Sequence, residues 1–144
     1  MAKSRYYFHL LAGMCMLELG NLASSLAPFN VSAVSVSLNA NAQEAGLVVT
    51  LELFFAAISS LYFGTVAYKG KSLGLFGSLI VIICYYLCSI AENIDQITII
   101  KGFSGVGCGM LIASGHSILA SSYDPNRSYA IFTLFASITA ALLI

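Results

Sequence analysis

Long apolar runs separated by short polar gaps make up almost the whole sequence. A helix that crosses the hydrocarbon core of a bilayer, roughly 30 Å thick, needs about 20 apolar residues. The pattern therefore predicts an all-α fold, a polytopic transmembrane helix bundle of about five spans in one domain over residues 1–144. The expected spans are Tyr6–Ser32, Gly46–Tyr68, Leu73–Ala91, Ile97–Ser121 and Tyr129–Ile144.

The polar gaps predict how the spans are connected. Pro28 lies near the end of the first run, where proline kinks or loosens a helix. A polar loop is expected at Asn39–Ala45. The links Lys69–Ser72 and Glu92–Gln96 are so short that the helices they join must be antiparallel neighbours. Residues Ser122–Arg127 form a turn-promoting cluster, in which proline stops the preceding helix.

Composition excludes several classes of protein. The chain is 59% hydrophobic and only 8% charged, too little charged surface for a soluble enzyme. Its net charge of zero offers no basic face for nucleic acid. The cysteines all lie inside apolar runs, so a disulfide framework is not expected. Cys84 and Cys88 share a helix face without further ligands, and neither a metal nor a cofactor is predicted.

The few charged residues alternate in sign from one gap between apolar runs to the next, and this alternation predicts a membrane topology. Basic residues precede the first run and occupy the second and fourth gaps, whereas the other gaps are acidic. Because basic loops stay on the cytoplasmic side, we expect a multi-pass protein of the plasma (inner) membrane with a cytoplasmic N-terminus. The basic residues are Lys3, Arg5, Lys69, Lys71 and Arg127, and the acidic ones are Glu44, Glu92 and Asp95.

The last apolar run is short. Residues 129–144 would give about 24 Å of helix at 1.5 Å per residue, and no polar cap follows Ile144. We therefore expect the chain to be cut within its fifth span.

The segment Gly64–Leu73 resembles the loop signature of the major facilitator superfamily of secondary transporters. That signature has a glycine, then Asp-Arg, then Gly-Arg-Arg or Gly-Arg-Lys. Two departures are present: Tyr68 replaces the acidic residue, and one residue before the second glycine is missing. The missing acid normally pairs charges that hold one conformation. Four positions match in kind: Gly64, Lys69, Gly70 and Lys71.

A second segment is similar to the same superfamily. Lys101, Gly105, Gly107 and Gly109 match a basic residue followed by a helix with a small residue at every second position. Residues 124–127 are similar to the inner loop before span five. The resemblance implies the N-terminal half of a carrier whose two six-helix halves enclose a site near the midplane. The implied partners are the missing C-terminal half, the lipid bilayer, a small-molecule solute and a coupling ion, expected to be the proton.

Polar residues inside apolar spans are candidate functional residues because they are costly there. Glu18 and Asn21 lie on one stripe of the first span, and Glu52 and Lys101 lie at similar depth in two others. All four are candidates for binding substrate or protons. For Glu52 and Lys101 the alternative is a purely structural ion pair. For Glu18 the alternative is a neutral glutamate with one hydrogen bond between helices.

The remaining motifs predict packing. Gly105 and Gly109 form a GxxxG pattern, as do Gly70 and Gly74, and we expect both to mark close helix crossings inside the bundle. His116 is expected to be a histidine near a helix end that bonds a neighbour.

These features predict an ion-coupled carrier of a small solute with no catalytic residues. Two alternatives remain open. A compact multidrug exporter would also use a glutamate in its first helix, as Glu18 could be, but such proteins have four spans. A non-transporting assembly subunit would need neither Glu18 nor Glu52.

Overall fold

A computed structural model describes residues 2–66 and 70–143, and all regular structure within them is helical. The predicted all-α bundle is therefore confirmed. The described residues form α1 (Ala2–Ser25), α2 (Ala27–Leu38), α3 (Ala42–Gly64), α4 (Gly70–Ile90), α5 (Ile94–Ala120) and α6 (Pro125–Leu143).

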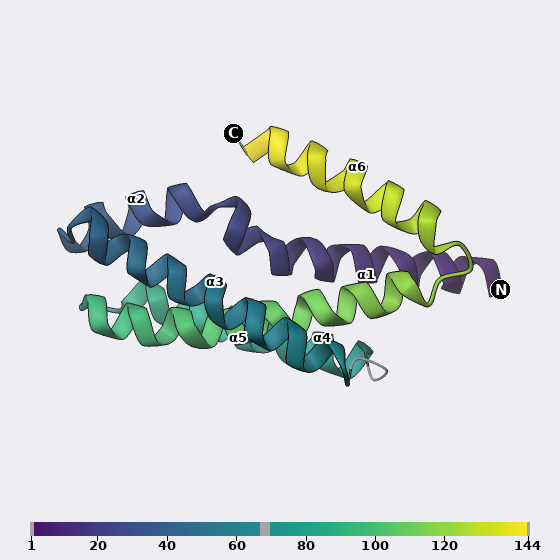
Figure 1. Cartoon of the computed structure of the whole chain (residues 1–144), viewed down its shortest axis with the longest axis horizontal. Helices are drawn as coiled ribbons and strands as arrows, with labels where there is room; N and C mark the ends of the chain where they lie inside the picture. The colour runs from purple at the N-terminus through teal and green to yellow at the C-terminus, as the bar shows by residue number, and fades with distance from the viewer. Residues whose placement is uncertain (1, 67–69, 144) are drawn as a thin grey trace.

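Helix α5 is the centre of the bundle. It packs extensively against α3, α4 and α1, whereas α2 packs mainly on α3. Helix α6 meets the bundle near its own start, where Tyr129 and Phe132 pack on Leu17 and Leu119, and its far end diverges from α1 (Figure 1). The core thus consists of the faces that α5 shares with its three neighbours.

Glycines allow the neighbours of α5 to approach its backbone closely. A Cβ on Gly105 would collide with the backbone carbonyl oxygen of Glu52 on α3, and one on Gly109 would lie 2.5 Å from the Ala56 oxygen. A Cβ on Gly107 would meet the Gly77 oxygen of α4 at 2.9 Å. Successive glycines at every second position therefore serve opposite sides of one helix. Gly105 and Gly109 thus lie at the close approach between α3 and α5.

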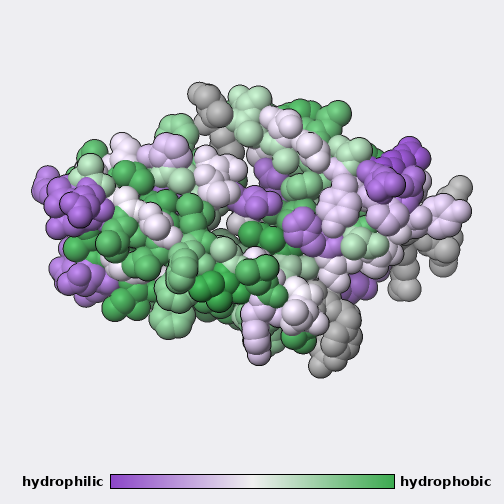
Figure 2. All heavy atoms as spheres, viewed as in Figure 1, coloured by the Kyte–Doolittle hydropathy of each residue, from purple (hydrophilic) through white to green (hydrophobic). Residues whose placement is uncertain are grey.

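Several helices suit a membrane. Within the described residues, α3, α4 and α5 are each long and apolar enough to cross one, and α1 with α2 would add a fourth crossing if they act as one bent span. Figure 2 shows hydrophobic side chains over much of this face, with hydrophilic ones at both ends and a smaller group near the centre. Helix α6 is not among these candidates, so the fifth span stays a prediction.

The first predicted span is broken. Residues Tyr7–Ser25 and Ala27–Leu38 are helical on either side of Leu26 and meet at 54°. Pro28 lies in the first turn of α2, where its missing N–H removes a bond that would continue α1. The predicted kink is confirmed, although the helix continues beyond the expected limit at Ser32.

The predicted loop at residues 39–45 is largely helical. The Asn41 side chain accepts a hydrogen bond from the Glu44 N–H at 2.8 Å, and the Glu44 carboxylate accepts one from the Asn41 N–H at 3.1 Å. This capping box starts α3 at Ala42, ahead of the expected Gly46. The non-helical connection is therefore shorter than the polar composition indicates.

Other boundaries also differ from the sequence-based ones. Helices α4, α5 and α6 begin a few residues earlier than predicted, and α3 ends at Gly64 rather than Tyr68, which lies outside the described residues. At the start of α6, Asp124 Oδ1 accepts a hydrogen bond from the Arg127 N–H at 3.1 Å. Pro125 occupies the first helical position, where proline is favoured, so it begins a helix as well as blocking the previous one.

The connections alternate between the two ends of the bundle. The start of α1, the end of α3 and the starts of α4 and α6 lie at one end, and the turns before α3 and α5 lie at the other (Figure 1). Lys71 and Arg127 belong to the first turns of α4 and α6, whereas Glu44 and Asp95 belong to those of α3 and α5. These two basic residues thus lie at the opposite end from these two acidic ones. Orientation in a membrane remains a prediction.

We predict that Gly105→Ala lowers the free energy of unfolding by about 1–3 kcal/mol, because the new methyl group overpacks the α3–α5 contact. Gly46→Ala on α3 is the control: its Cβ meets open space, so stability should stay constant or rise by up to about 1 kcal/mol. Unfolding in detergent, followed by circular dichroism, measures both. Equal stability of the two variants would contradict the close contact.

Candidate functional site

A charged cluster lies between α3 and α5. The Lys101 ammonium donates hydrogen bonds to both carboxylate oxygens of Glu52, at 3.3 Å to Oε1 and 3.0 Å to Oε2. The Ser104 hydroxyl donates a third bond to Oε1 at 2.9 Å. Glu52 is 0% exposed and Lys101 is 5% exposed. The structure therefore brings together the two residues whose pairing the sequence predicts.

The local sequence explains how this cluster forms. Lys101 and Ser104 are three residues apart on α5 and project toward the same part of α3. Gly105 follows directly and lets the α3 backbone at Glu52 come close enough for these bonds. The ring of Tyr85 on α4 lies under the ammonium, 4.4 Å from Nζ to the ring centroid, which adds a cation–π contact. Three helices thus share one buried charge pair.

The arrangement pairs two buried charges of opposite sign. Removing either charge alone would leave the other buried, whereas the pair together is satisfied. The assignment of Glu52 and Lys101 to substrate or proton binding stays a prediction.

A second polar region surrounds an open cavity of about 540 Å³ between α3, α5 and α6. This volume falls within the range of roughly 300–1,000 Å³ that is usual for small-molecule sites. Neither Glu52 nor Lys101 lines it. The lining residues are Ser60, Leu61, Gly64, Ile112, Ala113, His116, Ser117, Ala120 and Tyr129.

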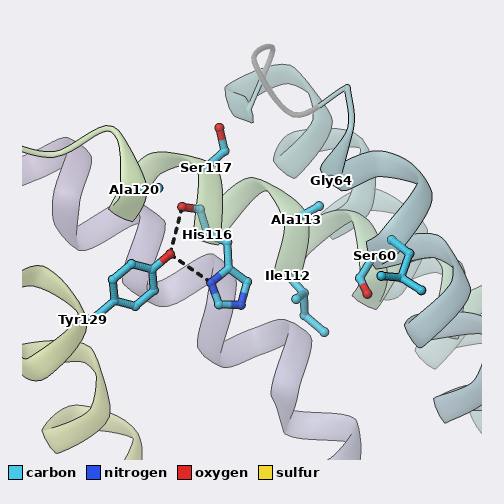
Figure 3. Close-up of a pocket in the computed structure, with 9 residues that line it drawn as sticks. Ser60, Gly64, Ile112, Ala113, His116, Ser117, Ala120 and Tyr129 are labelled. Carbon is cyan, nitrogen blue, oxygen red and sulfur yellow. Dashed lines mark hydrogen bonds between the residues drawn. The ribbon is translucent and has the colours of Figure 1, made fainter. Parts of the chain in front are cut away.

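One side of the cavity carries a pair of bonded aromatic groups. The Tyr129 hydroxyl donates a hydrogen bond to the backbone oxygen of His116 at 3.3 Å, and its oxygen lies 3.2 Å from Nδ1 of the same residue. The two rings are 5.8 Å apart between centroids and tilted by 32°. Figure 3 shows this pair at the cavity wall, with Ser60 on the facing helix. The expected bond of His116 to a neighbour is confirmed.

The other sequence-predicted residues lie elsewhere. Glu18 is half-buried on α1, and its carboxylate has no hydrogen-bond or ion-pair partner among the described residues. The Asn21 amide donates to the Leu17 carbonyl at 3.0 Å, within its own helix. Neither Glu18 nor Asn21 is bonded to Glu52 or Lys101.

The residues of the predicted loop motif lie on different helices and do not form one site. Gly64 ends α3 and lines the cavity, and Gly70 begins α4. The exposed Lys71 ammonium is 3.3 Å from Nε2 of His9 on α1, which links the starts of two helices. Lys69 lies outside the described residues.

Sequence reasoning did not identify Ser104, Tyr85, Ser60 or Tyr129 as parts of these sites. The spacing of Ser104 from Lys101 on one helix face could have identified the first. The others come from helices whose mutual packing a single sequence does not specify. Tyr85 packs against the ammonium of Lys101.

Metal chemistry finds no support in the described part of the chain, where no group of three or more His, Cys, Asp or Glu side chains is close enough to hold an ion. The cysteines are all free thiols. What the two regions can do is hold a charge pair out of water and accept a small molecule.

We predict that Lys101→Met lowers the free energy of unfolding by about 3–5 kcal/mol, because it leaves the Glu52 carboxylate buried with only Ser104 as a partner. The double variant Glu52→Met with Lys101→Met should recover much of that loss, since no charge is then buried. Lys71→Met, at an exposed lysine, is the control and should change stability little. Losses that simply add in the double-mutant cycle would show that the two residues act independently.

Comparison with known proteins found no matching family model, curated protein or solved structure. The resemblance of residues 64–73 and 101–109 to the major facilitator superfamily therefore stays a prediction from the sequence.

Proposed function

We propose that this chain is part of a membrane transporter, a secondary carrier of the major facilitator type that moves a small solute together with protons. The observation that carries the proposal is the cavity between α3, α5 and α6, in a bundle with several membrane-compatible helices. Four of its lining side chains carry hydrogen-bonding groups in a mostly apolar wall: Ser60, His116, Ser117 and Tyr129.

The helices of the cavity support this proposal. They correspond to the second, fourth and fifth spans expected from the sequence. Polar groups inside a membrane bundle mark solute or ion pathways more often than they serve the fold alone. A lipid-embedded assembly subunit would have no need of a cavity with hydrogen-bonding groups of this size.

Glu18 is our candidate for proton coupling. Its carboxylate is half-buried and has no partner within the described residues, so its charge can change without breaking a hydrogen bond or ion pair. Asn21 and Ser25 follow it on the same helix face. Glu52 is less suited, because its carboxylate is already bonded to Lys101 and Ser104.

A second bundle is part of the proposal. Alternating access requires two units that rock about a central site, and the described cavity is open on one side. The C-terminal half of the same carrier would cover it. We place the protein in the plasma (inner) membrane with its N-terminus in the cytoplasm, because the basic first turns of α4 and α6 lie at the same end as the start of α1.

The native protein should be two to three times heavier than the 15.2 kDa of this chain. An antibody raised against residues 1–10 and used on an immunoblot of the source membranes measures this. A band at 15.2 kDa would overturn the two-bundle carrier and favour an oligomeric or structural role.

Glu18→Gln should abolish solute-driven proton movement by the native-length protein in liposomes loaded with a pH-sensitive dye, with helix content unchanged. Neutral, cationic and anionic solutes are supplied in turn, with and without a membrane potential. Glu92→Gln, an exposed acid in the turn before α5, is the matched control and should behave as the unmodified protein. Unaltered coupling in Glu18→Gln would remove Glu18 from this role, and solute flux that ignores both pH gradient and potential would refute proton coupling.

A further inference from the structure

Among the described residues that line the cavity between α3, α5 and α6, none is Lys, Arg, Asp or Glu, and His116 is the one that could carry a charge. Moving a charged ligand out of water into the cavity would thus be costly, because the described wall offers no opposite charge to it. A neutral ligand meets no such penalty and can use the hydroxyl groups and the imidazole as partners.

The bonds of Tyr129 determine which nitrogen of His116 carries a hydrogen. A tyrosine hydroxyl has a single hydrogen, and here it is donated to the backbone oxygen of His116. A carbonyl oxygen only accepts hydrogen bonds. The second contact of the hydroxyl, at 3.2 Å to Nδ1, therefore needs its hydrogen from the imidazole. The Nδ1–H tautomer of neutral His116 is the one that makes both contacts of the Tyr129 hydroxyl hydrogen bonds.

The other ring nitrogen is then a free acceptor. A neutral imidazole carries one N–H, so Nε2 keeps its lone pair. Figure 3 shows Nε2 on the part of the ring turned away from the Tyr129 hydroxyl. Ile112 and Ser60 line the same cavity from α5 and α3. An acceptor in a wall of otherwise mostly apolar groups selects a ligand that can donate a hydrogen bond.

We propose that His116, held by Tyr129 as the Nδ1–H tautomer, uses Nε2 to recognise a small, neutral solute that has an O–H or N–H donor and an apolar part. Leu61, Ile112 and Ala113 would receive the apolar part. Tyr129 is a positioning residue in this scheme, because it acts through the imidazole. The solute class rests on the proposed carrier function, whereas the tautomer does not.

The tautomer is measured by ¹⁵N NMR of the native-length protein labelled on histidine, in detergent at a pH near 8.5, where an ordinary imidazole is neutral. Residues 1–144 contain two histidines. The His116→Gln variant lacks the two ring-nitrogen signals of His116 and so identifies them. We expect the ¹⁵N chemical shift of Nε2 to be that of an unprotonated nitrogen, and that of Nδ1 to be that of a protonated nitrogen. Tyr129→Phe should remove this preference. A protonated Nε2 in the unmodified protein would overturn the inference.

The solute class is tested with three four-carbon probes that have a hydroxyl at one end and differ at the other: 1,4-butanediol, 4-aminobutan-1-ol and 4-hydroxybutyrate. The other end is a second hydroxyl, an ammonium and a carboxylate, respectively. The neutral diol should shift the Nε2 signal of His116, and the charged probes should need roughly ten-fold higher concentrations for the same shift. His9, exposed on α1 and outside the cavity, is the internal control.

The outcomes separate the proposals. A larger shift from a charged probe, equal shifts from all three, or no shift from the diol would overturn the solute class. A shift from the diol in a protein that transports no solute would support a neutral-ligand site while refuting the carrier.

Discussion

The close contact between the backbones of α3 and α5 is the constraint on which the rest of the structure depends. Gly105 and Gly109 permit it, and only at that separation can Lys101 and Ser104 reach the Glu52 carboxylate. The ion pair in turn makes separation of the two helices costly, because each charge would then lack its partner. Small residues and buried charges therefore support one another: the glycines allow the close approach, and the ion pair holds it.

The sequence was sufficient for features that depend on one helix or on depth in the bilayer. Apolar run lengths predicted the helices, and the similar depth of Glu52 and Lys101 predicted their contact. The first residues of the helices were predicted less well, because capping hydrogen bonds rather than hydropathy determine them. The cavity was not predicted, since Ser60, His116 and Tyr129 come from three helices whose mutual rotation depends on packing. The number of spans and the family remain predictions.

The two polar regions have opposite characters. The charged cluster is closed off from solvent and held by three helices, so it favours one arrangement of α3, α4 and α5. The cavity carries neutral hydrogen-bonding groups and is open. Its third wall, α6, meets the described bundle mainly through its first turns, around Tyr129 and Phe132. A firm charged centre beside a loosely held wall allows the shape of the cavity to change while the centre stays intact.

The break at Leu26 has a consequence for how the chain fits its surroundings. Helices α1 and α2 contain 24 and 12 residues, and one straight helix of that combined length would measure about 54 Å. The hydrocarbon core of a bilayer is only about 30 Å thick, so a straight segment would extend far beyond it. The 54° bend makes the pair shorter from end to end than a straight helix, and α2 packs on α3. If α1 and α2 act as one span, the bend therefore reduces the mismatch between the length of the segment and the thickness of the hydrocarbon core.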